Sequence, residues 1–443
     1  MANPRKSALK ILIKIEKDGA YSNIALNNQL KEDNTTGVDA SFCSALVYGV
    51  LERKILLDYI IRQYTSLRLK KIETPVLNIL RMGILQIAFM DKVPESAAVN
   101  ESVKLAKGMR LNKASGFKNG VFRSFVRAGC AYKLPDKNSD RAMYYSVYYS
   151  MPKNIVNLWL NAYGEENTLS ILENLTGRPP VSVRVNTLKT TASKLKESFE
   201  RSGIGVQRVQ EMDNALLLSH TGAIENTSQY RQGLFHVQDT ASQLCCELLA
   251  PKENMLVYDF CSAPGGKAFT MAELMNNKGT IRAFDMYEHK VKLINNGAYR
   301  LGIENIKAAV ANALEDKKLP LADRILCDVP CSGLGIIRRK PEIRYKQDLG
   351  IDTLPQLQYD ILCSCAKHLK SGGILAYSTC TLNPDENENN VKRFLREHSQ
   401  FQPLKISIKD DIMNKIGIMD NAVTLLPQKN GSDGFFISLF IKR

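Results

Sequence analysis

The spacing of hydrophobic residues changes twice along the 443-residue chain. Over roughly the first 130 residues hydrophobic side chains recur at every third or fourth position, as at Leu77, Leu80, Ile84 and Ile87. Pro75 precedes this series at a position suited to the first turn of a helix. No segment before residue 130 alternates like a β-strand. The pattern therefore predicts that the first part of the chain is all-helical.

A mixed pattern follows the polar, proline-containing segment 131–140. Residues 181–185 alternate between hydrophobic and polar side chains like a half-buried strand, and a helix around 192–202 and a strand at 215–218 are predicted after it. Residues 141–235 are therefore predicted to form a small α+β module.

Strands and helices alternate after residue 236, which is typical of a parallel sheet with crossover helices. The hydrophobic run 435–441 is predicted to close this sheet, and the polar stretch 401–432 is predicted to be a loop-rich insertion. The predicted fold class is thus multidomain, with an all-α domain (1–135), a small α+β domain (141–235) and an α/β domain (236–443). The predicted strands of the α/β domain are 256–260, 280–284, 307–310, 324–327 and 374–377, with helices such as 290–301 and 357–369 between them.

Positive charge is concentrated in the front part of the chain. Lys and Arg outnumber Asp and Glu by 60 to 45, a net charge of +15, and residues 1–140 hold +10 of it. Clustered positive charge is expected on a surface that binds a nucleic-acid backbone. A solvated basic helix face is an equally good interpretation of one such run by itself. The run 104–127 contains seven basic residues and no acidic one: Lys104, Lys107, Arg110, Lys113, Lys118, Arg123 and Arg127.

The sequence predicts a cytoplasmic protein without a membrane or a metal. No hydrophobic run approaches the ~18–20 residues of a membrane span, and the N-terminal segment lacks the hydrophobic stretch of a secretory signal. Ten cysteines without regular spacing favour free thiols in a reducing compartment. No Cys-x-x-Cys pair and no suitably spaced histidines occur, so no metal ligand set is expected.

The first predicted strand of the α/β domain leads into a glycine-containing loop, Cys261-Ser-Ala-Pro-Gly-Gly-Lys267. Its two glycines allow the backbone to approach a ligand closely, at the crevice where doubly wound folds bind nucleotides. The loop lacks the first glycine and the Ser/Thr of a Walker A loop, and the Gly-x-Gly-x-x-Gly spacing of a dinucleotide site. Asp285 ends the next strand, where a carboxylate can accept ribose hydroxyls. The loop and the carboxylate together predict a cofactor that contains adenosine. The alternative is that the loop is only a structural turn and that an acidic residue follows the next strand by chance.

Two cysteines directly follow predicted strand ends on the same rim of the sheet. Cys331 lies in Asp328-Val-Pro-Cys-Ser-Gly, and Cys380 lies in Tyr377-Ser-Thr-Cys-Thr. A single cysteine is most often an inert buried side chain. Two cysteines at the same rim of the sheet make this interpretation less convincing, and both are therefore candidates for a chemical role.

A thiolate beside an adenosine cofactor suggests methyl transfer to carbon 5 of a pyrimidine. The thiolate adds to carbon 6, carbon 5 attacks a methyl sulfonium, a base removes the carbon 5 proton, and the thiol leaves. A free thiol has a pKa near ~8.5, so the site must favour the thiolate, and Lys267 is a candidate source of positive charge. Asp328 is the natural partner for the exocyclic amine of a cytosine.

Further segments carry a resemblance to a known family: Phe235-His-Val-Gln-Asp-Thr-Ala-Ser-Gln243, Arg338-Arg-Lys-Pro341 and Asp433-Gly-Phe-Phe436. With the glycine loop and both cysteine segments, the chain resembles bacterial Sun/Fmu-type 16S ribosomal RNA (cytosine-5) methyltransferases over nearly its whole length. The front segment, with Tyr21-Ser-Asn-Ile-Ala-Leu and Tyr48-Gly-Val-Leu-Glu-Arg53, is similar to NusB-type RNA-binding domains. The resemblance implies a NusB-like domain at 1–135, an RNA-binding α+β module at 141–235, and a Rossmann-like class I methyltransferase domain at 236–443.

The resemblance also implies the roles of individual residues. Cys380 would be the nucleophile and Cys331 would assist breakdown of the covalent adduct, with Asp328 and Lys267 completing the catalytic set. Asn312 stands where the family usually has an aspartate, so a weaker or altered cofactor contact is expected there. The implied contacts of S-adenosyl-L-methionine are Cys261, Ser262, Ala263, Pro264, Gly265, Gly266, Lys267, Asp285, Asn312 and Asp328.

The predicted function is methylation of carbon 5 of a cytosine in 16S ribosomal RNA, free or partly assembled, by a monomer. One alternative is the same chemistry on transfer RNA, which the NusB-like front domain disfavours. Another is a non-catalytic RNA-binding or antitermination-type factor. The two cysteines, Asp328 and the glycine loop argue against it, because a binding module needs none of them.

Overall fold

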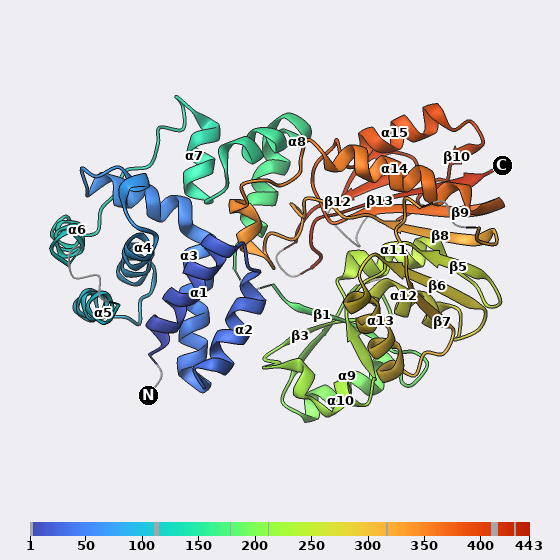
Figure 1. Cartoon of the computed structure of the whole chain (residues 1–443), viewed down its shortest axis with the longest axis horizontal. Helices are drawn as coiled ribbons and strands as arrows, with labels where there is room; N and C mark the ends of the chain where they lie inside the picture. The colour runs from blue at the N-terminus through green and yellow to red at the C-terminus, as the bar shows by residue number, and fades with distance from the viewer. Residues whose placement is uncertain are drawn as a thin grey trace. The chain divides into compact units, whose positions relative to one another are not determined.

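The computed structural model describes residues 3–109, 115–177, 179–210, 212–315, 318–408, 415–428 and 431–443 (Figure 1). The chain divides into two compact units. The first comprises Met1–Gly177 and Arg339–Gln347, and the second comprises Arg178–Arg338 and Asp348–Arg443.

The described part of the first unit is helical, as the hydrophobic spacing predicts. Leu46, Val50, Leu57, Leu80 and Ile84 are all fully buried in its core, which explains why they recur at helical spacing. The helices are α1 (Pro4–Asp18), α2 (Ser22–Glu32), α3 (Gly37–Gln63), α4 (Thr74–Phe89), α5 (Glu95–Gly108), α6 (Ser115–Arg127), α7 (Arg141–Tyr148) and α8 (Lys153–Asn174), with short 3₁₀ helices η1 (Leu69–Lys71) and η4 (Pro341–Tyr345).

The 3₁₀ helix η4 belongs to the first unit although its sequence lies inside the predicted α/β domain. Arg344 is 2% exposed, and its guanidinium donates to the carbonyl oxygens of Glu52 (2.9 Å) and Leu175 (2.8 Å). The Glu342 carboxylate accepts the backbone N–H of Ser22 at 3.1 Å. These buried polar contacts make η4 an integral part of the helical unit.

The second unit begins with a four-stranded antiparallel sheet in the order β2-β3-β1-β4. The predicted strands at 181–185 and 215–218 and the predicted helix around 192–202 are confirmed. Two strands were not predicted, because runs of four and three residues carry too little pattern. The elements are β1 (Val181–Val185), α9 (Ala192–Arg201), β2 (Gly205–Arg208), β3 (Ala215–Ser219), η3 (Ile224–Asn226), α10 (Ser228–Arg231) and β4 (Phe235–Val237).

A nine-stranded sheet forms the rest of the described second unit, in the order β11-β12-β13-β9-β8-β5-β6-β7, with β10 paired to β13. The five predicted strands are confirmed as its parallel part, and β13 runs antiparallel to β9. Helices α11, α12 and α13 pack on one face and α14 and α15 on the other (Figure 1). The elements are α11 (Thr240–Leu249), β5 (Leu256–Asp259), α12 (Gly266–Leu274), β6 (Thr280–Asp285), α13 (Glu288–Leu301), β7 (Ile306–Val310), β8 (Ala322–Asp328), α14 (Leu354–Lys367), β9 (Leu369–Thr379), α15 (Glu388–Glu397) and β13 (Phe435–Lys442).

The order of the parallel strands creates a switch point between β5 and β8. From β5 the chain passes outward through β6 to β7, then returns to β8 on the other side of β5. Ligands of open α/β sheets bind at the carboxyl ends of the strands beside such a reversal. The loops after β5 and β8 therefore meet at one edge of the sheet.

The prediction of a loop-rich insertion at 401–432 is wrong for the residues that the structure describes. Three further strands, β10 (Phe401–Pro403), β11 (Lys415–Met419) and β12 (Ala422–Leu425), lie in this stretch, whose residues 409–414 and 429–430 fall outside the described part. All four residues of β12 are buried, because it pairs with the hydrophobic β13. Pairing with another strand supplies the burial that a short local pattern does not reveal.

Candidate active site

The glycine loop links the end of β5 to the start of α12. Gly265 has φ +106°, and a Cβ there would come within 2.5 Å of the Phe269 ring, so only glycine fits this turn. The backbone N–H of Ser262 donates to the carbonyl of Phe284 at 2.8 Å. This bond fixes the loop to β6, beside the predicted ribose-binding carboxylate.

Lys267 and Asp328 form an ion pair across the switch point. Lys267 Nζ lies 2.7 Å from Asp328 Oδ2, and Ser378, which is paired with Asp328 in the sheet, donates its hydroxyl to Oδ1 at 2.7 Å. Burial alone would lower the pKa of Lys267, but the Asp328 carboxylate outweighs it and the pKa is raised. Lys267 therefore remains a cation at neutral pH, with its Nζ 5.2 Å from the centre of the Phe435 ring.

The two predicted cysteines meet at the same rim. Cys331 Sγ, in the loop after β8, lies 3.2 Å from Cys380 Sγ, just past the end of β9. The hydrogen bond with Cys380, together with burial, raises the pKa of Cys331 well above its ordinary value. The backbone N–H of Gly335 donates to the carbonyl of Cys380 at 3.0 Å, which holds the two loops together. Either sulfur atom can be the donor in this contact.

Asp285 and Asn312 lie at the ends of the neighbouring strands β6 and β7. Asp285 is 6% exposed, and its Oδ1 accepts the N–H of Tyr287 at 3.3 Å and lies 3.5 Å from Lys290 Nζ. The side-chain oxygen of Asn312 accepts the N–H of Leu314 at 3.1 Å, within its own turn. The amide nitrogen of Asn312 is the group left to face a ligand.

Asp259, at the end of β5, is a buried carboxyl group that the sequence did not single out as a site residue. It is 1% exposed, and neither carboxyl oxygen has a hydrogen-bond donor among the described residues. Burial raises its pKa to about 7. The hydrophobic pattern of the strand gave no signal that its last residue would be an unpaired acid.

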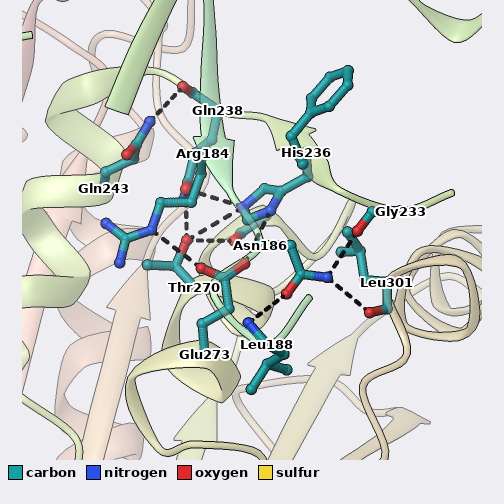
Figure 2. Close-up of polar contacts among 12 residues, drawn as sticks. Arg184, Asn186, Leu188, Gly233, His236, Gln238, Gln243, Thr270, Glu273 and Leu301 are labelled. Atoms are coloured by element: carbon teal, nitrogen blue, oxygen red, sulfur yellow. Dashed lines mark hydrogen bonds and ion pairs between the residues drawn. The ribbon is translucent and has the colours of Figure 1, made fainter. Parts of the chain in front are cut away.

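A buried polar network joins the small sheet to α12 (Figure 2). Arg184 of β1 donates to Glu247 at 2.5 Å and to Glu273 of α12 at 3.2 Å. His236 Nδ1 lies 3.5 Å from Glu273, and burial lowers the pKa of His236 to about 3. The hydroxyl of Thr270 donates to Gln238 at 2.6 Å. Sequence reasoning missed this network, although His236 and Gln238 lie in a segment that carries the family resemblance.

The described residues form neither a metal-binding cluster nor a membrane-spanning helix. They contain no group of three or more His, Cys, Asp or Glu side chains that could hold a metal ion. Within the same residues, no helix has both the length and the hydrophobicity needed to cross a membrane.

The basic run of the helical unit is only partly exposed. Lys118 is fully buried, and burial lowers its pKa, so it does not contribute to a surface patch. Lys104 is exposed but lies 2.8 Å from Glu101 in an ion pair. Arg110 and Lys113 lie outside the described residues. Three exposed basic members form no ion pair with a described residue: Lys107, Arg123 and Arg127.

Models of three protein families match this chain. The model described as 16S rRNA methyltransferase RsmB/F matches residues 246–441, the NusB family model matches 2–127, and an RsmF/B-like ferredoxin-like domain matches 151–225. The predicted fold class is thereby confirmed. The predicted boundaries of the three domains, 1–135, 141–235 and 236–443, stay predictions.

Curated relatives and solved structures are similar to the chain over its whole length. A probable ribosomal RNA small subunit methyltransferase B of Bacillus subtilis (strain 168) is 35% identical, covering 99% of this chain and 98% of the relative. A protein with the same description from Synechocystis sp. is 33% identical over 99% of each chain. The crystal structure of the protein PH0851 superposes with a TM-score of 0.82 and 25% identity, covering 99% of both chains.

Proposed function

Because this chain belongs to the ribosomal RNA small subunit methyltransferase B family, we propose that it methylates carbon 5 of a cytosine in 16S ribosomal RNA, with S-adenosyl-L-methionine as methyl donor. The observation that carries the proposal is the pair of sulfur atoms 3.2 Å apart, next to strand ends that also hold the Lys267–Asp328 ion pair. A factor that only binds RNA needs neither feature.

The residues at the carboxyl edge of β5 and β6 fit the proposed cofactor. The turn at Gly265 brings backbone to the crevice, and Asp285 offers a carboxylate whose Oδ2 accepts no hydrogen bond from a described residue. That oxygen can accept a ribose hydroxyl. The loop Cys261–Lys267, Asn312 and Asp328 are the other proposed contacts. When bound, S-adenosylmethionine supplies the electrophilic methyl sulfonium.

Two side chains of the chain hold the base in this proposal. The Asp328 oxygens, already bonded to Lys267 and Ser378, each retain a lone pair that can accept the exocyclic amine of cytosine. Lys267 Nζ, 2.7 Å from Asp328 Oδ2, places positive charge beside this carboxylate. The base is thereby selected as one that carries an amino donor.

The thiols divide the chemistry between them. Cys380 adds its sulfur to carbon 6 of the cytosine, which makes carbon 5 nucleophilic towards the methyl group. Carbon 5 would take the methyl group as the carbon–sulfur bond of the sulfonium breaks, with that bond's electron pair left on the donor sulfur. A base then accepts the carbon 5 proton, and the electron pair of the broken C–H bond expels the Cys380 thiolate and restores the aromatic ring. Cys331, whose raised pKa keeps it protonated at neutral pH, lies close enough to Cys380 to donate its proton to the departing thiolate.

The front domain favours ribosomal over transfer RNA as substrate, because it matches the NusB family and both curated relatives are described as acting on the small ribosomal subunit RNA. The experiment is transfer of a labelled methyl group from S-adenosylmethionine to 16S ribosomal RNA and, in parallel, to transfer RNA. We expect label in 16S RNA alone, recovered as 5-methylcytosine after nuclease digestion, and none with Cys380→Ala. Label only in transfer RNA, or on another base, would contradict the proposal.

A further inference from the structure

Glu386 is a buried carboxylate, 0% exposed, in the turn between β9 and α15. Its Oε2 accepts the backbone N–H of Ser332 at 2.9 Å and the amide of Gln358 at 2.8 Å. Its Oε1 accepts the Ser332 hydroxyl at 2.5 Å and the amide of Asn383 at 3.0 Å. Four donors surround it, and none of them is a cation.

These contacts join the two cysteine loops. Ser332 directly follows Cys331, and Asn383 lies three residues after Cys380. The hydroxyl of Ser332 also lies 2.6 Å from that of Thr381, the residue after Cys380. The carboxylate therefore bridges one cysteine loop to the other through two of its donors.

Asn387, the next residue, holds the Cys380 turn from both sides. Its side-chain oxygen accepts the hydroxyl of Thr379 at 2.5 Å, and its amide donates to the carbonyl of Thr381 at 3.0 Å. Cys380 is thus bracketed by two bonds to one side chain. Because Glu386 and Asn387 are consecutive, their α-carbons are a fixed ~3.8 Å apart, and the two sets of contacts move together.

We propose that Glu386 is the positioning residue that holds Cys331 and Cys380 at reacting distance, with Asn387 fixing the turn of Cys380. The importance of this role for turnover rests on the proposed function, whereas the positioning itself does not. A carboxylate suits the place, because its two oxygens accept four hydrogen bonds at once. Glutamine would turn an NH₂ group towards a donor and leave buried donors without a partner.

Glu388 offers a matched control two residues further on. It is also a buried glutamate, 3% exposed, but among the described residues its side chain accepts a hydrogen bond from the hydroxyl of Thr424 at 2.8 Å and from neither cysteine loop. Glu388→Gln changes the same chemical group on the same segment without touching the bridge.

The experiment measures how fast Cys331 and Cys380 form a disulfide when the RNA-free protein is treated with diamide, which takes up the two electrons and two protons that the thiols lose. Peptide mapping by mass spectrometry identifies the pair, and Cys331→Ser gives the background. We expect Glu386→Gln to slow this disulfide roughly 10- to 100-fold, the effect of losing a buried charged hydrogen-bond acceptor, and Glu388→Gln to leave the rate unchanged. The kcat for RNA methylation should fall with the rate, while the KM for S-adenosylmethionine stays constant.

A wild-type rate with Glu386→Gln, or an equal loss with Glu388→Gln, would overturn the positioning role. If Glu386→Gln does not fold, Ser332→Ala is the second variant, because it removes one hydroxyl donor to Glu386. It should slow disulfide formation by a smaller factor. An unchanged rate with Ser332→Ala would also overturn the positioning role. Disulfide formation needs neither RNA nor cofactor. A wild-type protein that forms the disulfide rapidly but transfers no methyl group would therefore refute the proposed function and leave the positioning role standing.

Discussion

Cys380 and Cys331 have different roles in the proposed reaction, and alanine substitutions separate them. Cys380→Ala should abolish turnover and leave S-adenosylmethionine binding intact, because no covalent bond to carbon 6 can form. Cys331→Ala should accumulate a protein–RNA adduct that survives a denaturing gel, because release is impaired. The gel, run with labelled RNA, is the measurement. An adduct with Cys380→Ala and none with Cys331→Ala would reverse the two roles.

Asp285 should matter for the cofactor and not for RNA. Asp285→Ala removes the carboxylate at the end of β6 and should weaken S-adenosylmethionine binding about ten- to a hundredfold, the effect of one charge-assisted hydrogen bond. Calorimetry of cofactor binding, with RNA affinity as the control, tests this. Unchanged cofactor affinity would remove Asp285 from the proposed site.

Asp259 should make stability depend on pH. Its pKa is raised by burial from 3.8 to about 7, so the folded protein holds a proton that the unfolded chain releases, and its contribution to stability is lost as the pH rises from ~4 to ~7. Relative to wild type, Asp259→Asn should gain stability over this range, by at most about 1.4 kcal/mol per pH unit. Urea unfolding of the cofactor-free protein at pH 5 and pH 7 measures the difference. The same stability difference between wild type and Asp259→Asn at pH 5 and at pH 7 would contradict this prediction. Asp352→Asn, at an exposed position, is the control.

The residues of the candidate site were predictable where residue type and strand position coincide. Lys267, Asp285, Asp328, Cys331 and Cys380 all follow or end strands at one edge of the sheet, and the structure brings the last two into contact. The burial of Lys118 and the hydrogen bonds of Glu386 were not predictable, because they depend on side chains distant in sequence.

At the level of elements, the network of Figure 2 ties β1 to α12, the helix that begins in the glycine loop. Burial raises the pKa of Glu273 to about 8 even though Arg184 opposes this, so at neutral pH Glu273 is largely a buried protonated acid that accepts a hydrogen bond from Arg184. Arg184→Met should lower the free energy of unfolding by roughly 1–3 kcal/mol, the usual cost of leaving a buried polar group without its hydrogen-bond partner. The midpoint of urea unfolding followed by circular dichroism is the measurement.

Adding Glu273→Gln to Arg184→Met should restore part of the loss, because the two residues share one interaction. Arg141→Met is the matched control, since Arg141 forms an exposed ion pair with Glu165 that is worth at most about 1 kcal/mol. Equal losses in the free energy of unfolding for Arg184→Met and Arg141→Met would mean that the buried network stabilises the protein no more than an exposed ion pair does.

Elements with a strong local pattern were predicted and elements without one were not. The central parallel strands β8 and β9 contain hydrophobic runs, Ile325–Cys327 and Ile374–Tyr377, because helices cover both faces of the sheet there. The short strands β2, β4, β10 and β12 are three or four residues long, and their neighbours in the sheet determine them. The 3₁₀ helix η4 was not predicted either: Glu342 and Arg344 are buried by contacts with residues far away in the sequence.

For the whole molecule, the excess of positive charge in the front part predicts salt-dependent RNA binding. If Lys107, Arg123 and Arg127 all contact phosphate, replacing them by Ala should make the slope of log affinity against log salt concentration less steep by about 2. Each phosphate contact with single-stranded RNA contributes ~0.7 to this slope. Specific and non-specific RNA should weaken alike, because phosphate contacts carry no sequence information. A salt titration of RNA affinity is the measurement. The control removes three other exposed lysines of the same unit, Lys6, Lys31 and Lys92, and an equal effect would point to net charge alone.

The first unit also sets an order of events during synthesis. Its two pieces are separated by residues 178–338, so the ribosome must add 170 residues after Gly177 before Gln347 completes the unit. At ~5–20 residues per second this takes on the order of 10–30 seconds. During that time the helices of the first piece have been synthesised, but the carbonyl groups of Glu52 and Leu175 do not yet have their hydrogen bonds from the guanidinium of Arg344. The part of the protein that is made first is therefore among the later parts to complete its fold. A fragment that stops at residue 177 would lack Arg344, the hydrogen-bond donor to the carbonyl groups of Glu52 and Leu175.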